Sequence, residues 1–183
     1  MTLETIRDCC SDQQLRAFAS TCCQRIWSQY PEEWADQVFE NDKMSSGRYV
    51  GPEHWKQLRG LVHALDIEAG ADRRGSAGAH RQLDQFINEM AGKMSFVSQR
   101  LGDTASGPEY EVGRVTLCAA RALRCAIAED IRNNVVECAK HAAYAIGFRW
   151  NEADEWAAVD AEKRVQARLI QATLQDPGRL TAE

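Results

Sequence analysis

The sequence predicts an all-α fold, built as a single-domain bundle of about six helices over residues 1–183. Apolar residues recur at helical spacing through most of the chain, and no run alternates apolar and polar residues for long enough to predict a strand. The four prolines fall where a helix can begin or has just ended. A chain of 183 residues is long enough to bury one core without disulfides.

Composition and charge narrow the class of protein. Hydrophobic residues make up 44% of the chain and charged residues 27%, close to the averages of globular domains. The net charge of −5 does not favour nucleic acid as a partner. No apolar run approaches the roughly 20 residues of a membrane span, and the first residues lack a signal-peptide pattern. We therefore expect a cytoplasmic protein that makes no membrane contact, with its seven cysteines as free thiols.

The first helix is expected over residues 11–28. Ser11 is a good N-cap, and Gln14 completes a capping-box pattern three residues later. One face carries Leu15, Phe18, Ala19, Cys22 and Ile26. A short helix is expected from Pro31, with Trp34, Val38 and Phe39 available for packing.

Three further amphipathic helices are expected, over residues 52–70, 79–101 and 151–176. The connector after residue 70 is rich in glycine and alanine and carries Arg73 and Arg74. The last helix is expected to use Trp156, Val159, Gln166, Leu169, Ile170 and Leu174 for packing.

The alanine-rich segment over residues 112–148 is expected at the centre of the bundle. Small side chains allow two helix axes to approach closely. One helix from Pro108 to Phe148 would be unusually long for a globular protein, so we predict either a helical hairpin or one long helix. A break is predicted near Asn133 and Asn134, because asparagine competes for backbone hydrogen bonds.

A resemblance comes from the stretch S-D-Q-Q-L-R-A-F-A-S-T-C-C-Q-R-I-W, which begins at Ser11. It resembles the opening segment of a family of bacterial proteins, mainly planctomycete, that has no assigned function. The stretch A-E-K-R-V-Q-A-R-L-I-Q-A-T-L-Q-D-P is similar to the family's C-terminal helix. The chain departs from the pattern at Ser20 and Thr21, and its end lacks the asparagine-proline-phenylalanine tail of many relatives. The resemblance implies lineage and fold, and it assigns no chemistry.

A fainter resemblance concerns helical bacterial immunity proteins, which protect against toxins. It rests on the order of the helices and on the stretch C-A-K-H-A-A-Y-A-I-G. This resemblance implies a protein partner.

Cysteine spacing raises the hypothesis of a zinc site. Cys118 and Cys125 share one helical face, and Cys138 and His141 share another. If the two faces met, the four side chains would form a ligand set of the Cys3His type. The competing interpretation is that all four are packed core positions on alanine-rich helices, which is the more common role of such residues.

No catalytic or nucleotide-binding motif is present in the sequence. We therefore predict a non-enzymatic protein-interaction module, of a regulatory, immunity-like or defence-associated kind, with no cofactor. The alternative is a zinc-binding or thiol-based protein that uses Cys118, Cys125, Cys138 and His141. The candidate interaction residues are Trp27, Trp34, Arg73, Arg74 and Trp150. Their competing interpretation is that tryptophans anchor helix packing and that the arginines are solvated.

Overall fold

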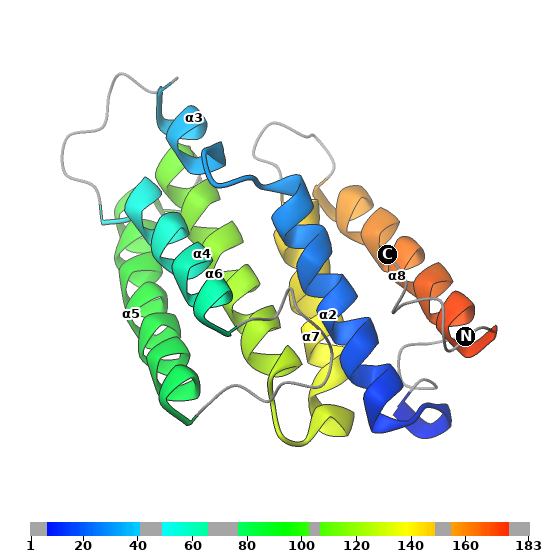
Figure 1. The fold of residues 1–183 in the computed structure, drawn as a ribbon. Helices are drawn as coiled ribbons and strands as arrows, with labels where there is room; N and C mark the ends of the chain where they lie inside the picture. Colours follow the sequence, from blue (N-terminus) through cyan, green and yellow to red (C-terminus); the bar gives the residue numbers. More distant parts are fainter. Residues whose placement is uncertain (1–6, 41–48, 66–76, 103–106, 149–154, 176–183) are drawn as a thin grey trace.

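The structure is a computed structural model, which describes residues 7–40, 49–65, 77–102, 107–148 and 155–175. Within these ranges the chain forms helices and no strand, so the predicted all-α fold is confirmed. Seven helices, labelled as in Figure 1, account for almost all of the described chain. They are α2 (Asp12–Gln29), α3 (Trp34–Glu40), α4 (Pro52–Leu65), α5 (Ala77–Leu101), α6 (Pro108–Ala126), α7 (Ile131–Gly147) and α8 (Glu155–Gln175).

The helices form a bundle with α6 and α7 in the middle (Figure 1). Helix α5 packs on the outer side of α6, and α8 packs on the outer side of α7. Helix α2 lies across both central helices, whereas α4 lies on α6 and touches α5 less extensively. This arrangement leaves α4 and α5 side by side on a shared support.

The helix starts follow the caps that the sequence offers. Ser11 and Gln14 form the predicted capping box of α2. Pro108 occupies the first turn of α6. The helix predicted to begin at Pro52 begins there. Its predicted end near residue 70 lies outside the described residues.

The central segment is a helical hairpin, but its break lies earlier than predicted. The chain leaves the helix after Ala126 and re-enters at Ile131, so the break predicted near Asn133 and Asn134 is present and lies a few residues before them. Asp130 is the N-cap of α7, and its carboxylate accepts the backbone N–H of Asn133 at 3.2 Å. The Asn134 amide donates to the Asp130 carbonyl at 2.7 Å. Both asparagines thus serve the first turn of α7.

Small side chains line the contact between α6 and α7. Both helices carry buried alanines, among them Ala119, Ala122, Ala139, Ala142 and Ala145. The apolar faces predicted for α2, α4, α5, α6 and α7 largely coincide with the buried core. On α8, Val159, Gln166 and Ile170 are buried as predicted, whereas Trp156 is 62% exposed and contacts Tyr144 with ring centroids 6.3 Å apart.

Helix α8 docks partly through polar contacts. Glu162 is 4% exposed and accepts two hydrogen bonds from the Arg25 guanidinium on α2, each of 2.7 Å. The Gln166 amide, also buried, donates to the Ala139 carbonyl on α7 at 3.0 Å. Such buried polar contacts fix the rotation and register of α8 against its neighbours.

Among the described residues, no helix combines the length and the apolarity that crossing a bilayer requires.

Removing the buried carboxylate of α8 is expected to destabilise the bundle. We expect Glu162→Gln to lower the free energy of unfolding by about 2 to 3 kcal/mol, because it loses a charge-assisted bond and leaves Arg25 unpaired. Asp160→Asn on the same helix breaks only an exposed pair with Lys163, so it should change stability by less than about 0.5 kcal/mol. Urea titrations of both variants test this expectation, and equal stability losses would contradict it.

Two glycines should respond to alanine in opposite directions. A Cβ at Gly147 would lie 2.6 Å from the backbone of Val159 on α8, so Gly147→Ala should cost about 1 to 3 kcal/mol through overpacking. Nothing lies within 4 Å of a Cβ at Gly92, in the middle of α5. Gly92→Ala should therefore stabilise the protein by about 0.5 to 1 kcal/mol. Thermal unfolding of the two variants tests both expectations. A raised Tm for Gly147→Ala would show that α8 does not pack this closely on Gly147.

Candidate functional site

The four residues of the zinc hypothesis occupy different environments. Cys118 and Cys125 are half-buried on α6. Cys138 is buried against α2, where its thiol donates to the Ala19 carbonyl at 3.7 Å and hydrogen-bonds with the Cys23 thiol. His141 is half-buried on α7, with its Nε2 3.8 Å from the Glu137 carboxylate.

The environment of these thiols suppresses their reactivity. The hydrogen bond with Cys23, followed by burial, raises the pKa of Cys138 well above its usual value. Burial, followed by the neighbouring Cys23, raises the pKa of Cys22 in the same way. Burial likewise raises the pKa of Cys125 to about 11. These thiols stay protonated at neutral pH, and a protonated thiol is a poor nucleophile.

The histidine is also neutral at physiological pH. Burial and the nearby Arg121 lower the pKa of His141 from its usual value. Across the described chain, no group of three or more histidine, cysteine or acidic side chains is placed to hold a metal ion. The zinc hypothesis therefore gains no geometric support and stays a prediction, which metal analysis of protein purified without added zinc tests directly.

The candidate interaction residues that the structure describes lie mainly inside the bundle. Trp27 is 6% exposed, and its ring centroid lies 5.6 Å from that of Trp55. Trp34 is half-buried and packs on Trp55 and Tyr30. These indoles form an aromatic cluster that joins α2, α3 and α4. Arg73, Arg74 and Trp150 lie outside the described residues.

A different pair of aromatic residues faces solvent. Tyr49 is 46% exposed and Phe96 is 56% exposed, and their rings stack with centroids 5.7 Å apart and planes 20° apart. The Arg100 guanidinium lies 5.5 Å from the centre of the Tyr49 ring. We call Tyr49, Phe96 and Arg100 the aromatic platform.

A buried carboxylate holds the aromatic platform in place. Glu109, in the first turn of α6, accepts the backbone N–H of Val50 at 2.9 Å and also that of Tyr49. The same carboxylate pairs with Arg100. One side chain therefore fixes both the backbone at Tyr49 and the guanidinium beside the ring.

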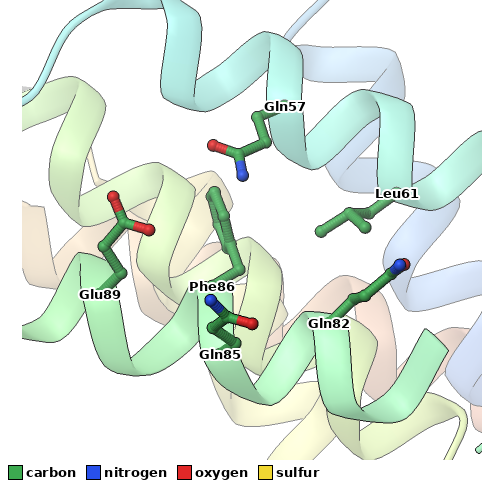
Figure 2. Close-up of a pocket in the computed structure, with 6 residues that line it drawn as sticks. All are labelled: Gln57, Leu61, Gln82, Gln85, Phe86 and Glu89. Atoms are coloured by element: carbon green, nitrogen blue, oxygen red, sulfur yellow. The ribbon is translucent and has the colours of Figure 1, made fainter. Parts of the chain in front are cut away.

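A cavity of about 320 Å³ lies beside the platform, between α4 and α5 (Figure 2). Phe86 and Leu61 supply its apolar surface, and Glu89 supplies a carboxylate. Figure 2 shows the side chains of α4 facing those of α5 across the opening. The remaining lining residues are Gln57, Gln82 and Gln85. We call this space the glutamine cavity.

A polar bridge joins the two helices between the cavity and the platform. The Lys93 ammonium lies 2.6 Å from Nε2 of buried His54 and 2.6 Å from the Glu89 carboxylate. Nδ1 of the same ring lies 3.1 Å from the Gly51 amide nitrogen, 3.2 Å from the Gly51 carbonyl oxygen and 3.2 Å from the Glu53 carboxylate. The Lys93 hydrogen bond to Glu89 lowers the pKa of that carboxyl, so Glu89 is ionised at neutral pH.

The residues that line the cavity can make hydrogen bonds and apolar contacts with a ligand. The cavity offers neutral amides, an apolar floor and one paired carboxylate, with no thiol, hydroxyl or imidazole among its six lining residues. Sequence reasoning missed both parts of the site. One signal was available, because Phe96 falls off the core spacing set by Met94 and Val97. No signal in the sequence pairs residue 49 with residue 96.

Thiol labelling tests the inert character of the buried cysteines. At pH 8, Ellman's reagent should modify exposed Cys9 rapidly. Cys22, Cys23 and Cys138 are buried and should react only on unfolding, and a pKa of about 11 leaves about one Cys125 thiol in a thousand ionised. Cys9→Ser should remove the rapid phase. Rapid labelling of Cys138 in the folded protein, located by peptide mass spectrometry, would contradict this account.

No protein-family model, no curated protein and no solved structure matches this chain. The resemblances drawn from the N-terminal and C-terminal stretches therefore stay predictions.

Proposed function

We propose that this protein is a non-enzymatic protein-interaction module that contacts its partner through the aromatic platform. The observation that carries the proposal is the exposed, stacked pair Tyr49 and Phe96 with Arg100 beside it. Tyrosine and arginine are enriched among the residues that dominate binding energy at protein interfaces.

The platform is preorganised for binding. Glu109 fixes the backbone at Tyr49 and pairs with Arg100, and ring stacking limits the motion of Phe96. Side chains that are ordered before association lose less conformational entropy when a partner arrives. A rigid aromatic surface that remains in solvent is thus more consistent with recognition than with core packing.

The partner that we propose is another protein, in the cytoplasm. The acidic net charge argues against a nucleic-acid backbone as the main ligand. All seven cysteines are free, which suits a reducing compartment. A regulatory or immunity-like role is the biological class that this proposal favours.

Partner capture tests the proposal. Tagged protein is incubated with native lysate of the organism that carries the gene, and captured proteins are quantified by mass spectrometry. Wild type should enrich a defined protein, and Phe96→Ala should reduce that enrichment at least tenfold because it removes half of the stacked pair. Asn88→Ala changes an exposed residue of α5 away from the platform and should capture the partner as wild type does.

Trp156→Ala provides a second control on another exposed aromatic residue. If Trp156→Ala abolishes capture while Phe96→Ala leaves it intact, the binding surface is on α8 and the proposal is wrong. If neither wild type nor any variant enriches a protein, the proposal also fails.

A further inference from the structure

We propose that the partner presents an extended, uncharged peptide segment, which lies along the groove between α4 and α5 from the aromatic platform to the glutamine cavity. This inference rests on the proposed function and names the class of partner. We use the word groove for the strip of surface with Tyr49, His54, Gln57 and Leu61 on one side and the facing residues of α5 on the other, and the part of this strip that is hollowed is the glutamine cavity.

Contacts between the two helices set α4 and α5 in antiparallel register. Tyr49 stacks on Phe96, and His54 bonds to Lys93. Farther along, α4 reaches the glutamine cavity at Gln57 and Leu61, where the facing residues of α5 are Gln82, Gln85, Phe86 and Glu89. On α5, positions 82, 86, 89, 93, 96 and 100 fall on one helical face. The platform and the cavity are therefore the two ends of one continuous face.

The length of this face suits a short extended segment. Gln82 and Phe96 are fourteen positions apart on α5, which is about 21 Å along the helix axis. An extended chain advances about 3.3 Å per residue, so about six residues span this distance. Between the two ends His54 is buried, and Lys93, whose side chain is 30% exposed, forms the surface over which the segment would pass.

The chemistry of the cavity matches a peptide backbone. The Gln57, Gln82 and Gln85 side chains are exposed, and none of them hydrogen-bonds to another described residue. Each amide offers both donors and an acceptor, as does each peptide unit of an extended chain. Three such amides around one opening can therefore bind successive backbone groups.

The charges in the groove select against a charged segment. Glu89 is the one charged residue among the six that line the cavity, and Lys93 already neutralises it at 2.6 Å. At the other end, Arg100 is paired with Glu109. A charged ligand side chain would lose hydration in the groove without gaining a free opposite charge.

The floor of the cavity accepts one apolar side chain. Phe86 and Leu61 form that floor, and about 320 Å³ is near the lower limit for ligand pockets. The volume suits an anchor residue of a longer ligand rather than a whole cofactor. A second anchor, aromatic or aliphatic, would lie on the platform.

Peptide selection and NMR titration test the inference. A phage library of random heptapeptides is selected on the full-length wild-type protein, and the enriched sequences are synthesised with blocked ends. Enriched peptides should be uncharged, with two apolar anchors. Their addition should shift the side-chain amide resonances of Gln57 and Gln85 in a ¹⁵N-labelled protein. The double variant Gln57→Ala/Gln85→Ala should bind at least tenfold more weakly, whereas Asn88→Ala should bind as wild type does.

Selection of acidic or basic peptides, selection of none, or full affinity in the double variant would each overturn the inference. Capture from lysate distinguishes a failure of this inference from a failure of the proposed function. If Phe96→Ala loses the partner and the double glutamine variant keeps it, the platform binds a protein but not through an extended segment in the groove. If both variants keep the partner, both proposals fail.

Discussion

Close packing of α6 against α7 is the constraint on which the rest of the bundle depends. Alanines along both helices bring their backbones together, and α2, α5 and α8 then pack around this pair. Helices α4 and α5 are both positioned by α6 and only secondarily by each other. The glutamine cavity lies between these two helices.

The same packing explains the cysteines. Cys22, Cys23 and Cys138 lie where α2 crosses α7, and a small apolar side chain is what such a crossing accommodates. The Cys138 thiol donates to the Ala19 carbonyl, so it also satisfies a backbone oxygen. Burial raises the pKa values of Cys22 and Cys125, and it contributes with the Cys23 hydrogen bond to the raised pKa of Cys138. Packing is therefore sufficient to explain why cysteine occupies these buried positions.

Helical periodicity was sufficient to predict the fold class, the Ser11 cap and most of the core, because all of these are encoded within single segments. It placed the central break a few residues too late, because Asp130 caps α7 and the two asparagines that follow lie in the first turn of that helix. It could not predict the candidate site, which depends on contacts between segments far apart in the chain. Spacing indicates that a face is apolar, but it does not indicate which neighbour covers that face. Trp27 is covered by Trp55, whereas Trp156 and Phe96 remain exposed.

Glu109 joins the aromatic platform to the start of α6 through its contacts with Tyr49, Val50 and Arg100. Burying a carboxylate is unfavourable unless its oxygens are fully engaged, and replacing a buried ion pair with apolar residues is often neutral or stabilising. An apolar residue at this position would pack the start of α6 without that penalty. It would not, however, fix two successive backbone N–H groups and a guanidinium around an exposed ring. The carboxylate is therefore best understood as the group that sets the orientation of Tyr49 and Arg100 towards solvent.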